Sequence, residues 1–161
     1  MTENLNFSVK GHFELSDMKS GRILVSKPNL VVNTAKTIIT NALVGHPSGD
    51  YISFMGFGED STPAVISDRV LWNQVYQVAC GYDNQPVPYF EDFTEIDGSV
   101  TQSAKVTFSC ILDESVVSSG ISEAGLFSSR QFMFSRITFA PQVKDGSQSW
   151  LVRWTLNIRI S

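Results

Sequence analysis

The sequence has few of the side chains that most often carry chemistry. Its 161 residues include only two histidines, His12 and His46, and two cysteines, Cys80 and Cys110. His12 falls on the polar side of an alternating segment and His46 in a Gly-His-Pro turn, so both are expected at the surface. The cysteines have no metal-binding or redox spacing, which favours two reduced, mostly buried thiols and leaves a disulfide between them open. None of the four is expected to be needed for function.

Catalytic and cofactor-binding motifs are also missing. The sequence has no Gly-x-Ser-x-Gly elbow, no phosphate-binding loop and no His-Glu-x-x-His. Gly56-Phe57-Gly58 lacks the third glycine and the following helix of a dinucleotide site. The acidic groups at 59–60 and 91–97 follow no calcium-loop pattern. We therefore expect no catalytic residue, no cofactor and no metal site, since an enzyme would need an ordinary pair of carboxylates to meet in the fold.

Long apolar runs and clustered basic residues are scarce as well. No run approaches the ~20 apolar residues of a membrane span, and residues 1–10 do not resemble a signal peptide. A net charge of -4 argues against binding to nucleic acid. Between positions 45 and 100 nine acids accompany one base, Arg69. This separation is typical of a solvated surface, but it could also orient one copy against a partner of opposite polarity. We expect a protein made in a cytoplasm, without membrane contact.

Alternation of apolar and polar residues is the dominant pattern, and it predicts strands with one buried face. The segments that carry it, or that form short apolar runs, are 7–15, 22–26, 51–57, 74–80, 100–112, 121–127, 132–139 and 150–160. One segment has helical spacing instead, with Asn33 or Thr34 as the cap of a short helix near residues 34–44. Its apolar positions are Ala35, Ile38, Ile39 and Ala42.

About eight strands, one helix and no strand-helix-strand rhythm predict an all-β fold. Two antiparallel sheets packed face to face, in a jelly-roll-like sandwich, would bury one face of each strand. The length of the chain fits a single domain over residues 1–161.

Glu123 falls on the apolar side of its strand, where an unpaired charge would be very unfavourable. If residues 128–131 form a four-residue hairpin loop, the register pairs Phe127 with Phe132, Gly125 with Phe134 and Glu123 with Arg136. We therefore predict a partly buried Glu123–Arg136 pair that fixes the register, with Phe134 covering Gly125. The alternative is a solvent-exposed acid near a sheet edge, because a strand face shifts with a register error of one residue.

Residues 81–98 form a long stretch rich in acids and aromatics, with at most one short strand. Loops of this length in compact domains are usually functional or interface-forming. Its aromatic side chains are a candidate partner surface and the basis for predicting a homo-oligomer, most simply a trimer: Tyr82, Tyr89, Phe90 and Phe93. A carbohydrate-binding module is an alternative from a different class of function. It would need an exposed aromatic platform made of Trp72, Tyr76, Tyr82 and Tyr89. We expect these side chains to lie in the core or at an interface instead.

Three groups of segments resemble a family of small virion proteins of tailed bacteriophages. The first is residues 10–15 with the turn to Gly21 and then 28–33, and the second is 54–58 with 62–64. The most specific group is Ile121-Ser-Glu-Ala-Gly-Leu-Phe127, followed by 133–136, 139–144 and 154–158. Together these segments touch most of the chain, and they are structural signatures rather than an active site.

The resemblance implies a structural component of the virion, made in the host cytoplasm. The first expectation is a capsid decoration or cement protein that binds across neighbouring copies of the major capsid protein and stabilises the head shell. The alternative is a tail, collar, baseplate or fibre adaptor protein. The number of copies per particle would distinguish this alternative from a capsid decoration protein. The sequence shows no collagen-like or coiled-coil extension, so a compact unit is expected rather than an elongated fibre. Trimeric assembly is also common among proteins of this kind.

Overall fold

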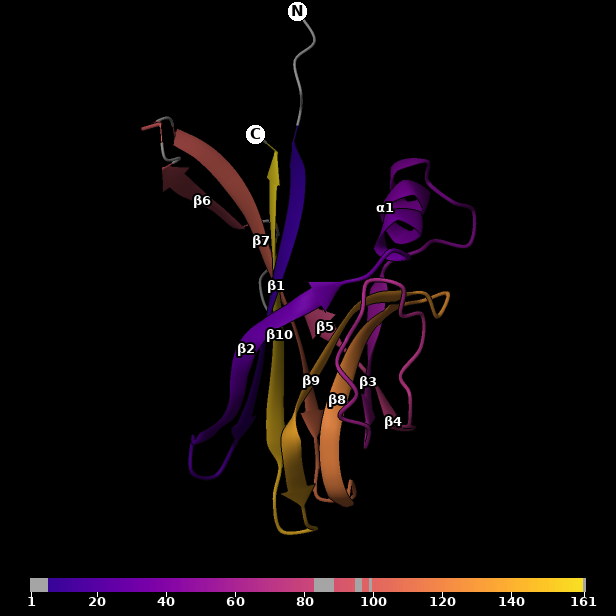
Figure 1. The fold of residues 1–161 in the computed structure, drawn as a ribbon, viewed down its shortest axis with the longest axis vertical. Helices are drawn as coiled ribbons and strands as arrows, with labels where there is room; N and C mark the ends of the chain where they lie inside the picture. Colours follow the sequence, from indigo (N-terminus) through magenta and orange to yellow (C-terminus); the bar gives the residue numbers. More distant parts are fainter. Residues whose placement is uncertain (1–5, 83–88, 95–96, 99, 161) are drawn as a thin grey trace, which may run out of the picture.

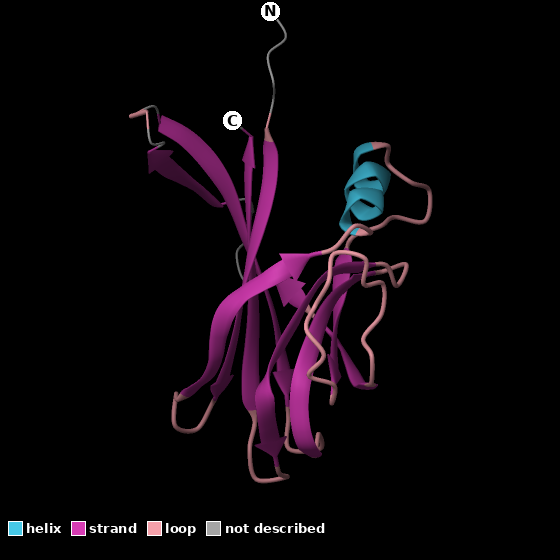
Figure 2. Ribbon diagram, in the orientation of Figure 1, coloured by secondary structure: helices cyan, strands magenta, loops and turns pink. Residues whose placement is uncertain are grey.

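The computed structural model describes residues 6–82, 89–94, 97–98 and 100–160, without the side chains of 89–94 and 101–102. Within these residues the fold consists of antiparallel strands with one short helix (Figure 2). The elements are β1 (Phe7–Asp17), β2 (Ile23–Val31), α1 (Ala35–Leu43), β3 (Ile52–Gly58), β4 (Gln74–Ala79), β5 (Gly81–Tyr82), β6 (Tyr89–Thr94), β7 (Val100–Leu112), β8 (Ser118–Ser128), β9 (Met133–Lys144) and β10 (Trp150–Ile160). The all-β class and the short helix are therefore confirmed.

Strands whose alternation is uninterrupted have the predicted bounds, while strands that contain a proline are longer than expected. β7 and β10 match the predicted segments, because their apolar positions repeat at every second residue to both ends. β2 runs past Pro28 and β9 past Pro141, where a turn or a strand end was expected. A proline is tolerated in a strand at a position that does not donate to the ladder.

The strands form one continuous antiparallel sheet rather than two separate sheets. Its order is β4-β3-β8-β9-β2-β1-β10-β7-β5, and β6 pairs with β7 beside β5. β2 pairs with β1 over most of its length, but it pairs with β9 through only two residues, Leu30 and Val31. This bend at β2 joins the two halves of the sheet (Figure 1). The sheet curves until it is nearly barrel-shaped, so the predicted two-sheet, jelly-roll-like sandwich is not confirmed.

The core lies between the two curved halves. Phe13 of β1 stacks on Phe139 of β9 with ring centroids 5.5 Å apart, and it meets Trp154 of β10 edge-on at 5.1 Å. All three side chains are buried. Aromatic pairs of these geometries add to the hydrophobic stabilisation that comes from burial. These contacts join β1, β9 and β10 across the core.

The helix α1 follows directly from β2 and lies beside the sheet rather than on it (Figure 1). Ala35 and Ile38 are buried as predicted, Ile39 is half-buried, and Ala42 is exposed. Thr34 is the first cap residue, but its hydroxyl donates to the carbonyl of Met133 instead of capping the helix. That bond ties the start of α1 to β9. In the described part of the chain no helix is long and apolar enough to cross a membrane.

Candidate functional site

The most elaborate polar arrangement is an ion pair between Glu123 of β8 and Arg136 of β9. The Nε and Nη2 atoms of Arg136 donate to Oε2 of Glu123 at 3.1 and 2.8 Å. Both side chains are 0% exposed. The predicted pair is therefore present, and its burial is complete rather than partial.

Asp68 completes the cluster from the loop between β3 and β4. Its Oδ2 accepts from Nη1 of Arg136 at 2.9 Å and from the backbone N–H of Val65 at 2.9 Å. Burial opposes ionisation of Asp68, but the hydrogen bond from Val65 and the Arg136 guanidinium outweigh it and lower the pKa of the carboxyl. Arg136 thus holds two carboxylates from two different parts of the chain.

The second half of this loop is held by Glu123 itself. The backbone N–H groups of Trp72 and Asn73 donate to Oε2 and Oε1 of Glu123 at 3.1 and 2.7 Å. The Trp72 ring also lies over Arg136, with the guanidinium carbon 5.9 Å from the ring centroid. We name Asp68, Glu123 and Arg136 the buried charge cluster; Trp72 and Asn73, which are exposed, lie at its edge. Its hydrogen bonds attach the loop to the centre of the β8–β9 pair.

Three glycines make room for this attachment. A Cβ atom on Gly58 would lie 2.4 Å from Oε1 of Glu123 and 2.5 Å from the carbonyl oxygen of Asn73. Gly56 and Gly125 face each other across β3 and β8, and added Cβ atoms there would lie 2.9 and 2.7 Å from the ring of Phe127. The Gly-x-Gly of β3 is therefore a packing feature, as the sequence indicated.

The predicted register of β8 and β9 is wrong by two residues. Gly125 pairs with Arg136 and Glu123 pairs with Thr138. One residue of the shift arises at the hairpin end, where Phe127 pairs with Met133, and the bulge after Leu126 adds the second. A shift of two keeps every side chain on its original face, so Arg136 still reaches Glu123, diagonally. Phe134 does not cover Gly125; the neighbours there are Phe127 and Leu71.

A second buried charge, Lys144 at the end of β9, was not predicted from the sequence. Its Nζ donates to the carbonyl oxygens of Asp113, Val116 and Gln148 at 2.6, 2.9 and 2.5 Å. Burial lowers the pKa of Lys144, although nearby acids including Asp113 act in the opposite direction. The ammonium joins the β7–β8 loop to the β9–β10 loop.

The structure describes only one of the four side chains of the predicted partner surface, that of Tyr82. Tyr82 is 46% exposed and its ring meets Phe108 edge-on at 6.5 Å. Tyr89, Phe90 and Phe93 lie on β6, and their side chains are outside the described residues. The stretch is more regular than predicted, because β5 and β6 both add to β7.

The aromatic side chains that a sugar platform would need contact different parts of the sheet. Trp72 lies over Arg136 on β9, whereas Tyr82 lies against Phe108 on β7. The hydroxyl of Tyr76 donates to the carbonyl of Val117 at 2.5 Å. Tyr76 therefore has a structural role in joining β4 to the loop before β8.

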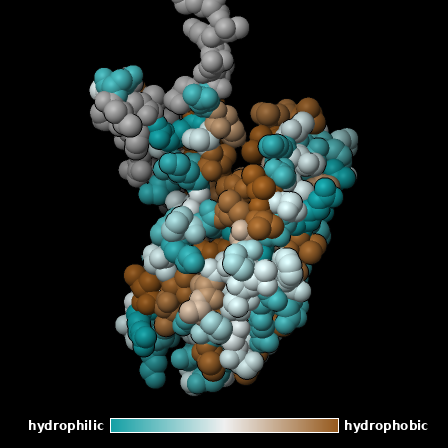
Figure 3. Space-filling model, viewed as in Figure 1, coloured by the Kyte–Doolittle hydropathy of each residue, from teal (hydrophilic) through white to brown (hydrophobic). Residues whose placement is uncertain are grey.

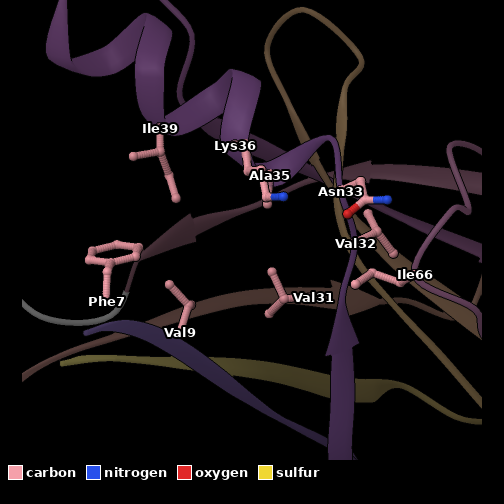
Figure 4. Close-up of a pocket in the computed structure, with 9 residues that line it drawn as sticks. All are labelled: Phe7, Val9, Val31, Val32, Asn33, Ala35, Lys36, Ile39 and Ile66. Carbon is pink, nitrogen blue, oxygen red and sulfur yellow. The ribbon is translucent and has the colours of Figure 1, made fainter. Parts of the chain in front are cut away.

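An apolar groove of about 190 Å³ lies between α1 and the strands β1 and β2 (Figure 4). Ile39 points from the helix toward Val9 and Val31, and Phe7 closes one end. Phe7 and Ile66 are 53% and 58% exposed, and hydrophobic side chains gather on this face (Figure 3). The groove is smaller than pockets for drug-sized ligands, which start at about 300 Å³.

The histidines and cysteines lie close to where the sequence placed them. His12 is exposed, with Nε2 2.9 Å from Oγ of Ser26, and His46 is half-buried beside Arg130, with which it shares a hydrogen bond of 2.8 Å. Cys110 is buried, Cys80 is half-buried, and neither forms a disulfide.

Of the acids considered as cation ligands, Glu59 and Asp60 accept hydrogen bonds, while the side chains of Glu91, Asp92 and Glu95 lie outside the described residues. Oε1 of Glu59 accepts from the hydroxyl of Ser118, and Oδ1 of Asp60 accepts from the N–H of Thr62. Among the described residues no group of three or more His, Cys, Asp or Glu side chains is arranged to hold a metal ion. Comparison with protein-family models, with curated proteins and with solved structures gives no match for this chain.

Proposed function

We propose that this chain is a structural component of a tailed-bacteriophage virion, and specifically a capsid decoration protein that stabilises the head shell. The observation that supports it is the convergence of the segments that resemble that family. Residues 121–127 and 133–136 belong to one hairpin, Gly56–Gly58 lies far from them in sequence, and all three segments meet at the buried charge cluster. These three segments therefore form one structural unit, while other resembling segments lie on β1, β2 and β10.

The chemistry of this unit is that of a rigid building block. Each hydrogen bond of Glu123 holds either Arg136 or the backbone of the β3–β4 loop. Lys144 in the same way donates to carbonyl oxygens of two loops. Buried polar networks of this kind rigidify a fold when all their members are paired. Rigid loops suit a protein that must present one fixed surface to a lattice.

The proposed contact with the shell is the end of the molecule that carries α1. Leu43 and Val44 at the end of the helix are 82% and 70% exposed, and the apolar groove opens beside the helix. Exposed apolar patches on soluble domains mark interaction sites. A protein that binds only the assembled shell lowers the free energy of that state by mass action, which would stabilise the head.

The β6–β7 pair projects at the same end of the molecule as α1 (Figure 1). We propose that it joins copies of the chain into a trimer, with Tyr82, Tyr89, Phe90 and Phe93 as the contact. Light scattering of the purified protein at ~100 μM should give three times the monomer mass, because an expected dissociation constant of ~1 μM would be far exceeded. A monomer at that concentration would contradict the trimer.

Quantitative mass spectrometry of purified particles, calibrated with the purified chain, tests the proposed function. A copy number on the order of hundreds, with antibody label on the head, is expected for decoration of a repeated lattice. About a dozen copies or fewer, with label on the tail, would favour the tail, collar, baseplate or fibre adaptor. Absence from particles would contradict both. A glycan array tests the carbohydrate-binding alternative, for which the expected result is no binding.

A further inference from the structure

Cys80 directly precedes β5, and Cys110 lies on β7, the strand with which β5 pairs. β5 pairs antiparallel with β7, so that Gly81 lies opposite Ser109 and Tyr82 opposite Phe108. The next position in this register places Cys80 opposite Cys110. Facing residues of an antiparallel pair have Cα atoms about 4.5 to 5.5 Å apart, within the range of about 4.4 to 6.8 Å that a disulfide spans.

The two cysteine side chains also share a face. Tyr82 and Phe108 meet edge-on at 6.5 Å, so their side chains lie on the same side of the pair. Cys80 and Cys110 are each two residues away, and side chains two apart in a strand point the same way.

Contacts with β3 place both cysteines at the same point of the core. Sγ of Cys110 lies 3.5 Å from Sδ of Met55, and the N–H of Cys80 donates to the carbonyl of Ser53 at 2.8 Å. Burial raises the pKa of Cys110 to about 12, with a further contribution from Cys80, and it raises the pKa of Cys80 to about 11.

Cys80 is located where the two ends of the sheet meet, so a bond at this residue would affect the whole fold. Cys80 lies between β4 and β5, which are the two ends of the strand order. The chain itself joins these ends at Cys80, and a bond to Cys110 of β7 would fix that junction to the sheet. The nearly closed sheet would then be covalently closed at its seam.

We propose that Cys80 and Cys110 form a disulfide when the folded protein meets a small disulfide oxidant such as oxidised glutathione. The half-buried Cys80 loses its proton to solvent and attacks one glutathione sulfur, and the departing glutathione thiolate takes up a proton. Cys110 then loses its proton, attacks the sulfur of Cys80 and displaces the second glutathione, which is protonated in turn. Two electrons pass from the cysteines to glutathione; one S–S bond forms in the protein and one breaks in the oxidant.

The use of this bond rests on the proposed function. A virion protein is made in a reducing cytoplasm, where thiols stay reduced, and it enters an oxidising exterior when the particle is released. A disulfide between Cys80 and Cys110 that forms after release would stabilise the protein outside the cell, where no new copies of the protein are made.

Incubation of the purified full chain with oxidised glutathione, followed by thiol titration and peptide mapping without reduction, tests the proposal. The expected result is loss of both thiols, a peptide that links Cys80 to Cys110, and a thermal midpoint raised by roughly 6 to 12 °C. Retention of both thiols, a persistent glutathione adduct on Cys80, or a dimer linked through Cys80 would each overturn it.

Two single variants separate the steps. Cys110→Ala should stop at the glutathione adduct on Cys80, and Cys80→Ala should leave the buried Cys110 unmodified. If Cys110→Ala does not fold, the peptide map of the unmodified protein still decides the question. These measurements need no particle, so absence of the chain from virions would contradict the proposed function and leave the disulfide standing.

Discussion

Arg136 reaches Glu123 diagonally across the β8–β9 pair, with two hydrogen bonds to one carboxylate oxygen, although the residue opposite Glu123 is Thr138. The diagonal reach leaves Oε1 of Glu123 to accept from Asn73, and leaves Nη1 of Arg136 to bind Asp68. One ion pair therefore connects two strands and a loop. Its role is to position the loop between β3 and β4.

Arg136→Ala should lower the free energy of unfolding by roughly 3 to 5 kcal/mol, because it leaves Glu123 and Asp68 buried without their cation. Urea unfolding measures the change. Arg130→Ala is the matched control, since Arg130 is exposed and its loss should cost less than about 1 kcal/mol. A cost below about 1 kcal/mol for Arg136→Ala would contradict the structural role of the cluster.

Gly58→Ala should destabilise the protein by roughly 1 to 3 kcal/mol or more, because the new methyl group would lie 2.4 Å from Glu123 and 2.5 Å from the backbone of Asn73. The backbone oxygen cannot move without displacing the loop. Gly81→Ala is the control, since a Cβ there meets nothing within 4 Å. Equal unfolding midpoints for the two variants would show that the loop can move aside.

Asp68→Asn should cost more stability at pH 7 than at pH 3. The pKa of Asp68 in the folded protein is lower than the ordinary value of 3.8, so the unfolded chain is protonated first as the pH falls. The stabilisation from ionised Asp68 is therefore complete above pH 3.8 and is lost as the pH falls through the folded value. The difference in the free energy of unfolding between wild type and variant reports on Asp68 alone, because the other acids are the same in both proteins. A difference that stays constant from pH 7 to pH 3 would contradict the assignment.

The sequence was sufficient to locate eight of the ten described strands and the partner of Glu123, because both depend on a period of two. The predicted β8–β9 register was wrong by two residues, yet an even shift leaves faces unchanged and the pair intact. One residue of the shift comes from the bulge and one from the hairpin loop, in which Gln131 has a φ of 65° and the hydroxyl of Ser128 accepts from two backbone N–H groups.

Features that depend on contacts between distant segments could not be predicted. The third member of the cluster, Asp68, comes from a loop with no periodic pattern, and the loop takes its path from contacts 50 or more residues away. Lys144 reads as an ordinary surface lysine in sequence, because its carbonyl partners are backbone atoms with no sequence signal. The continuous sheet depends on the bend of β2, where Pro28 suggested a turn.

Val44→Glu should weaken binding to assembled heads while leaving the isolated protein as stable as before. Val44 is 70% exposed at the end of α1, so a charge there should change the free energy of unfolding by no more than about 0.5 kcal/mol. At a contact with the shell, however, the same charge would be buried without a partner. Val143→Glu is the matched control, since Val143 is 67% exposed and lies at the far end of β9, away from α1 (Figure 1). Co-sedimentation of each variant with heads that lack the protein measures the difference. Retained binding by Val44→Glu together with loss by Val143→Glu would place the contact at the opposite end, where Lys144 holds the two loops.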